Sequence, residues 1–68
     1  MHLEAMRERL RHAPFVPFTL KTVDGRGFRV VHPDFLSLYS HQLLHTDAMS
    51  KAVTILDPRL VVSLDLET

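Results

Sequence analysis

The sequence contains no cysteine, and this absence removes two means by which small proteins are stabilised. Disulfide bonds and thiolate metal sites are both excluded. At 68 residues the chain is expected to form one domain, residues 1–68. A core of this size rarely supplies more than about 3–5 kcal/mol of stability. Histidine or carboxylate metal binding, self-association or marginal stability remain as alternatives.

Long apolar runs are also missing. No segment approaches the roughly 18 residues needed to cross a bilayer. The first residues, Met1–Arg7, lack the apolar core of a secretion signal. We therefore expect a cytoplasmic protein with no membrane partner.

The chain has no net charge, because eight Lys and Arg residues balance eight Asp and Glu residues. Residues 1–33 hold six cations and three anions, a balance of +3, whereas residues 34–68 hold two cations and five anions, a balance of −3. A zero net charge disfavours non-specific binding to nucleic acid, which requires neutralisation of phosphates. It favours self-association.

Two local patterns organise the first half of the chain. Leu3, Met6 and Leu10 recur at helical spacing, which predicts a helix over residues 2–12 that ends before Pro14. Asp24-Gly25 then predicts a tight hairpin between strands at 18–23 and 28–32. The alternation within these strands predicts an inward-facing set: Phe18, Leu20, Phe28 and Val30.

The second half is expected to be mostly strand. Residues 35–39 fit a third strand, with 43–45 as a short continuation, although residues 35–45 also permit a helical reading. Residues 51–56 and 61–67 predict two further strands, the last with Val62, Leu64 and Leu66 on its buried face. The fold class is therefore α+β: an N-terminal helix followed by about five short antiparallel strands that form a small curved sheet or barrel.

Three motifs resemble those of a family of small uncharacterised bacterial proteins that has no established activity. They are Pro14-Phe15-Val16-Pro17-Phe18, Asp24-Gly25-Arg26 and His32-Pro33-Asp34-Phe35. The order of elements is similar to Sm-like and SH3-like barrels, and the Sm-like resemblance implies ring formation and RNA binding. The nucleotide pocket of Sm-like proteins relies on an asparagine and an Arg-Gly pair. This chain has no asparagine, and its Arg26-Gly27 lies in the first hairpin.

Basic residues at the hairpin form a candidate contact with nucleic acid: Lys21, Arg26 and Arg29. A platform for single-stranded nucleic acid also requires outward aromatic side chains, and Phe28 is expected to face inward. RNA binding through these three residues is therefore the alternative function and not the first.

The candidate metal ligands are His41 and His45, with His32 and Asp34 as additional ligands. His41 and His45 are four residues apart, but a metal site needs three or four converging ligands. His32 and Asp34 resemble a catalytic pair, yet no nucleophile elbow surrounds the nearby serines. We expect no enzymatic activity, no cofactor and no metal.

Several apolar residues do not fit the inward-facing set. The candidate interface consists of Val23, Val31, Tyr39 and Val61, together with one of Leu43 and Leu44. A contiguous apolar patch marks an interface, and burying it would add the stability that a small core lacks. The sequence thus predicts a non-enzymatic protein-interaction or self-assembling module, with a second copy of the chain as its partner.

Overall fold

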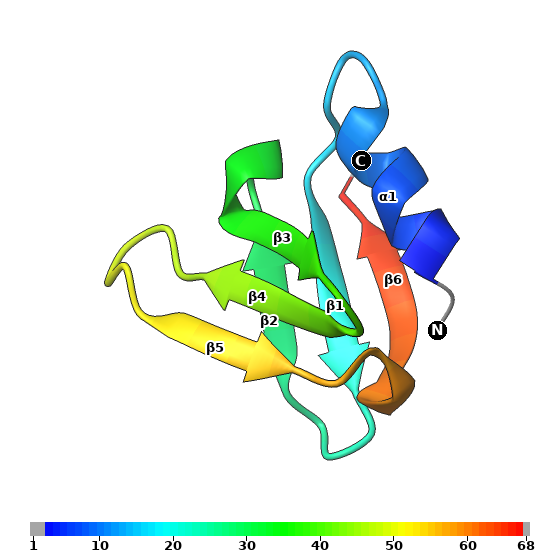
Figure 1. Ribbon diagram of the computed structural model, residues 1–68. Helices are drawn as coiled ribbons and strands as arrows, with labels where there is room; N and C mark the ends of the chain where they lie inside the picture. Colours follow the sequence, from blue (N-terminus) through cyan, green and yellow to red (C-terminus); the bar gives the residue numbers. More distant parts are fainter. Residues whose placement is uncertain (1–2, 68) are drawn as a thin grey trace.

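The computed structural model describes residues 3–67, which form one α-helix, six strands and two short 3₁₀ helices (Figure 1). In chain order these are α1 (Leu3–Arg11), β1 (Phe18–Thr22), β2 (Gly27–Val30), η1 (Pro33–Phe35), β3 (Leu36–Tyr39), β4 (Gln42–Thr46), β5 (Val53–Leu56), η2 (Pro58–Leu60) and β6 (Val61–Leu66). The strands are antiparallel and make two three-stranded sheets, ordered β2-β1-β6 and β3-β4-β5. The α+β class is confirmed.

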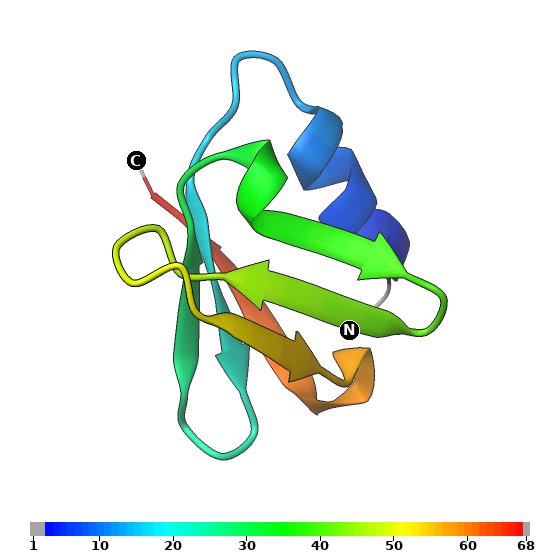
Figure 2. The same ribbon diagram turned by 60° about the vertical axis from the view of Figure 1, so that its left-hand side comes forward.

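The two sheets cross each other, as the turned view shows (Figure 2). Within residues 3–67 no strand ladder joins one sheet to the other, so the two sheets do not form a closed barrel. The structure has six strands because Ser40, at a φ of 57°, turns the chain sharply between β3 and β4. The segment expected as a continuation of the third strand is therefore a strand of its own.

The predicted hairpin is present, with strands that end earlier than predicted: residues 18–22 and 27–30 in place of 18–23 and 28–32. Phe18 lies opposite Val30, and Lys21 lies opposite Gly27. Gly25 takes a φ of 86°, the left-handed conformation that glycine adopts without steric cost. The first sheet is completed by β6, which pairs with the other side of β1.

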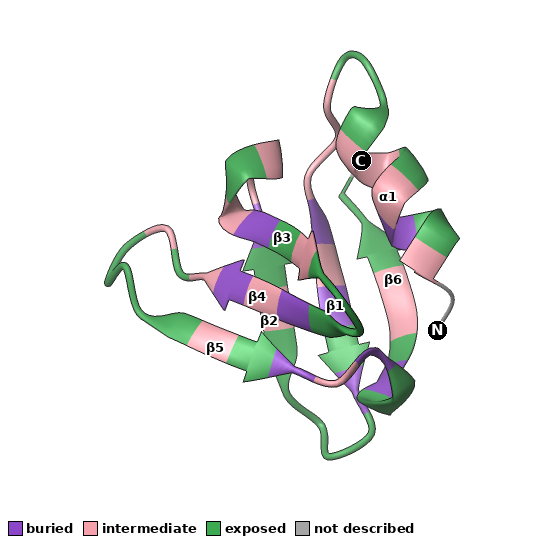
Figure 3. Ribbon diagram, viewed as in Figure 1, coloured by how far each residue is buried: buried purple, intermediate pink, exposed green. Residues whose placement is uncertain are grey.

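The core lies between the two sheets and under α1 (Figure 3). Its buried apolar members are Met6, Phe18, Leu20, Val30, Leu36, Leu43, Leu56 and Val61. Of the four residues predicted to face inward in the hairpin, three are fully buried, and Phe28 is half-buried and packs against the core.

Helix α1 contributes its predicted apolar stripe. Met6 is buried, and Leu3 and Leu10 pack partly against the core. The helix ends at Arg11, one residue earlier than predicted, and His2 lies outside the described residues. No helix in the described part of the chain is long and apolar enough to span a membrane.

The predicted facing of β6 is right at its end, where Leu64 and Leu66 lie opposite the buried Leu20 and Phe18, although Leu66 is 45% exposed. It is wrong at the start of the strand, where Val61 is buried at 2% exposure and Val62 is 61% exposed. The cause is a β-bulge: Lys21 pairs with Ser63, but the next residue, Thr22, pairs with Val61. Val62 is thus the extra residue, and it reverses the alternation of side chains that precede it. Val61 consequently belongs to the core and not to the candidate interface.

Candidate interaction surface

β5 is an edge strand with one free side. Among the described residues, 3–67, it pairs with β4 alone, and Figure 1 shows it at the margin of the molecule. The Asp47 amide donates to the Ala52 carbonyl at 2.9 Å, at the start of this ladder. Because antiparallel ladders alternate, Thr54 and Leu56 also bond to β4. The backbone N–H and C=O groups of Val53 and Ile55 therefore point away from β4.

The outer face of the β3-β4-β5 sheet carries no charged side chain. Alternation and burial place seven residues on it: Ser37 and Tyr39 from β3; Gln42, Leu44 and Thr46 from β4; Val53 and Ile55 from β5. Val53 and Ile55 are 63% and 62% exposed, and Tyr39 is 70% exposed. The register puts Ile55 beside Leu44, so the two aliphatic side chains are neighbours across the strands. We call these seven residues the uncharged face.

The outer face of the β2-β1-β6 sheet has the opposite character. Arg29 donates to both carboxylate oxygens of Glu67, with its Nη2 2.9 Å from Oε1. Lys21 Nζ lies 3.8 Å from Asp65 Oδ2. Charges of both signs alternate over this sheet, and its surface is close to electrically balanced.

The three residues of the candidate nucleic-acid contact all have carboxylate partners. In addition to the two pairs above, Arg26 Nε donates to Asp24 Oδ2 at 2.8 Å. The guanidinium of Arg26 also lies over the half-buried ring of Phe28 at 5.2 Å. A phosphate would have to compete with these carboxylates, which reduces the positive potential available for nucleic acid.

The residues of the candidate interface do not all meet on one surface. Of Leu43 and Leu44, the first is in the core and the second lies on the uncharged face. Tyr39 lies on the uncharged face, Val23 is exposed in the β1–β2 turn, and Val31 is half-buried after β2. Val61 is in the core. Val53 and Ile55 were not assigned to the surface from the sequence. The signal that identifies them is the lack of charge at alternate positions within each strand, namely 37 and 39, then 42, 44 and 46, then 53 and 55.

The two histidines with metal-like spacing have different roles. His45 is 4% exposed, and its Nε2 donates to the backbone carbonyl of Arg29 at 2.7 Å. A carbonyl can only accept, so Nε2 carries the proton. The His45 ring also packs edge-on against Phe28, with centroids 5.3 Å apart. His45 thus connects β4 to the outer edge of β2, whereas His41 is exposed in the β3–β4 turn.

His32 and Asp34 lie next to each other at the surface, at the start of η1. No group of three histidine or acidic side chains converges within residues 3–67. His32 Nδ1 accepts from the Asp34 amide at 3.2 Å and so caps η1. Its nearest contact with the Asp34 carboxylate is 3.6 Å, and both side chains are largely exposed.

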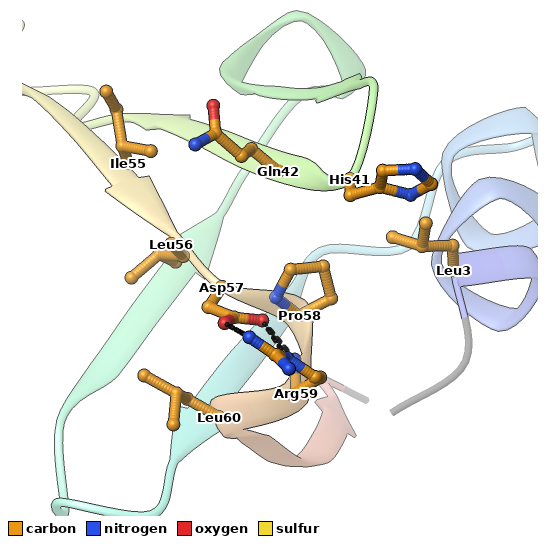
Figure 4. Close-up of a pocket in the computed structure, with 9 residues that line it drawn as sticks. All are labelled: Leu3, His41, Gln42, Ile55, Leu56, Asp57, Pro58, Arg59 and Leu60. Atoms are coloured by element: carbon orange, nitrogen blue, oxygen red, sulfur yellow. Dashed lines mark hydrogen bonds and ion pairs between the residues drawn. The ribbon is translucent and has the colours of Figure 1, made fainter.

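An open groove of about 1060 Å³ adjoins the end of β5 (Figure 4). Leu3, Ile55, Leu56, Pro58 and Leu60 supply its apolar lining, and His41, Gln42, Asp57 and Arg59 its polar lining. Asp57 caps η2 by accepting from the Arg59 amide at 2.9 Å, and its carboxylate also pairs with the Arg59 guanidinium at 2.7 Å. These bonds, the side-chain one first, lower the pKa of Asp57 from 3.8 to about 2. Asp57 therefore remains a carboxylate at neutral pH.

Comparison of the chain with protein families, with curated proteins and with solved structures finds no match. The resemblance to a bacterial family and to Sm-like barrels accordingly stays a prediction. Any function has to be argued from the residues themselves.

Proposed function

We propose that the protein is a non-enzymatic, self-assembling interaction module that associates through the uncharged face and the free edge of β5. The observation that carries this proposal is the contrast between the two sheets. One outer surface carries charges of both signs in two ion pairs, and the other has no charge and exposes Tyr39, Val53 and Ile55. Interface cores are depleted in charge and enriched in apolar and aromatic residues.

The energetics of a small domain support the same function. Among residues 3–67 the core has eight buried apolar side chains, and the sequence has no cysteine that could reinforce it with a disulfide. Association adds stability by mass action, because a partner binds the folded state and not the unfolded chain. For the architecture we propose an open relative of the Sm-like or SH3-like barrel, since the two unjoined sheets pack on one core.

The test is sedimentation velocity from low to high micromolar protein. We expect the wild type to associate and Ile55→Lys to be monomeric, because a lysine in the uncharged face would have to be desolvated. Val62→Lys is the matched control, since Val62 is 61% exposed but lies on the other sheet. It should associate as the wild type does. A monomeric wild type, or an Ile55→Lys variant that still associates, would refute the proposal.

RNA binding through Lys21, Arg26 and Arg29 is the less supported function, because each cation already has an acidic partner. Fluorescence anisotropy with a labelled single-stranded oligonucleotide tests it. Binding that weakens steeply with salt and is lost in the double variant Arg26→Glu, Arg29→Glu would favour RNA binding over the first proposal.

A further inference from the structure

We infer that the partner of the β5 edge is a second copy of the same strand, paired antiparallel about a twofold axis that passes beside Thr54. This inference rests on the proposed function and adds its geometry. The two copies would form one six-stranded sheet ordered β3-β4-β5-β5-β4-β3.

The backbone groups allow one register. Only Val53 and Ile55 within β5 direct their N–H and C=O groups away from β4, as the ladder with Asp47 and Ala52 requires. An axis beside Thr54 places Val53 of each copy opposite Ile55 of the other. Each of these pairs exchanges both of its hydrogen bonds, which gives about four bonds in all.

The neighbouring registers use groups that are already engaged. An axis at Val53 would require Lys51, which has a φ of 65° and donates its amide to Asp47. An axis at Ile55 would require the backbone of Asp57, whose carbonyl accepts from Leu60. The register centred on Thr54 needs neither residue.

The side chains in this register match each other. On the outer face, Val53 meets Ile55 of the second copy, and Leu44 and Thr46 flank the pair. On the inner face, Thr54 of one copy lies opposite Thr54 of the other. β-branched aliphatic and threonine pairs are favourable across antiparallel strands. The seam thus brings together no charged or mismatched side chains.

The charges just outside β5 are complementary. The same register sets Lys51 of one copy towards Asp57 of the other, at both ends of the seam. In the single chain, Lys51 is exposed over the Phe35 ring at 5.3 Å, and Asp57 is paired with Arg59. Complementary charges fix the register of an interface and exclude alternatives.

The other edge strands fit a partner strand less well. β2 carries Arg29, whose backbone carbonyl is occupied by His45, and β6 carries Asp65 and a bulge. Charges and bulges protect edges from pairing. β3 is uncharged but directs Ser37 and Tyr39 outward, whereas β5 directs outward two β-branched aliphatic side chains, the type that pairs best in sheets.

Disulfide trapping tests the register directly, because the natural chain has no cysteine. Thr54→Cys should form a covalent dimer on mild oxidation, since Cα atoms of such a pair lie about 4.5 Å apart. Val53→Cys alone and Ile55→Cys alone should cross-link weakly, since equivalent atoms would be roughly 8 Å apart along the diagonal. A mixture of the two single variants should give the heterodimer.

The outcomes separate the geometry from the proposed function. Two results would show that the register is wrong while the proposed surface still stands, provided that the wild type associates. In the first, Val53→Cys alone gives the most cross-linked dimer. In the second, neither Thr54→Cys nor the mixture of Val53→Cys and Ile55→Cys gives a cross-linked dimer. If the wild type is monomeric by sedimentation, both the strand pairing and the proposed function are refuted. If Thr54→Cys does not fold, the mixture of Val53→Cys and Ile55→Cys still tests the register, because both positions are exposed. Val62→Cys measures the background of cross-linking by random collision.

Discussion

Replacing His45 with phenylalanine is expected to destabilise the protein, because this histidine joins the two sheets. His45 donates from β4 to the Arg29 carbonyl on β2 at 2.7 Å and is 4% exposed. A phenylalanine of similar shape keeps the edge-on ring contact with Phe28 but lacks the donor. The substitution therefore isolates the hydrogen bond from the packing.

The expected loss of unfolding free energy is large relative to the total stability of the domain. Leaving this part-buried carbonyl without its partner costs about 1–3 kcal/mol. A domain of this size has only about 3–5 kcal/mol of stability. His45→Ala should cost more, because it also removes the ring contact, worth roughly 0.5–1.5 kcal/mol, and leaves a cavity.

Urea unfolding followed by far-ultraviolet circular dichroism measures both variants. A lower midpoint with an unchanged slope reports a change in stability alone. His41→Phe is the matched control, since His41 is exposed in the β3–β4 turn. This substitution should change the free energy of unfolding by no more than about 0.5 kcal/mol. Our reasoning fails if His45→Phe is as stable as the wild type.

Three further substitutions test the hairpin, the core and a helix cap. Gly25→Ala should cost about 1–2 kcal/mol in urea unfolding, because φ is 86° there, and Gly27→Ala much less. Leu43→Ala should cost about 2–5 kcal/mol and leave much of the protein unfolded by circular dichroism, since Leu43 is fully buried. Asp57→Ala should lower the Tm at pH 7. Because folding lowers the pKa of Asp57 from 3.8 to about 2, its contribution is present above pH 4, and the difference in Tm should vanish as the pH falls through 2. A difference that persists at pH 2 would contradict this origin.

Local patterns were sufficient to predict the N-terminal part of the fold. The apolar stripe predicted α1, and Asp24-Gly25 predicted the hairpin and the facing of Phe18 and Leu20. Each of these features depends on residues close together in the chain. The number of strands was harder to predict, because the separation of β3 from β4 depends on Ser40 adopting a left-handed conformation that serine rarely takes.

The candidate surface was less accessible to sequence reasoning. The strand at 53–56 has apolar residues on both sides, so alternation alone does not say whether Ile55 or Leu56 faces the core. That choice depends on which strand lies beside it, and β4 supplies the answer. The partners of Lys21 and Arg29 were also not predictable, since Asp65 and Glu67 come from the far end of the chain.

The bulge at Val62 has a consequence for chain length. Removing one residue from a strand normally turns every following side chain to the opposite face. Here the excision of Val62 would leave Val61 opposite Thr22 and Leu64 opposite Leu20, and the ladder with β1 would become continuous. A variant one residue shorter should therefore fold with the same core, and β6 is a strand in which a deletion is tolerated at one position only.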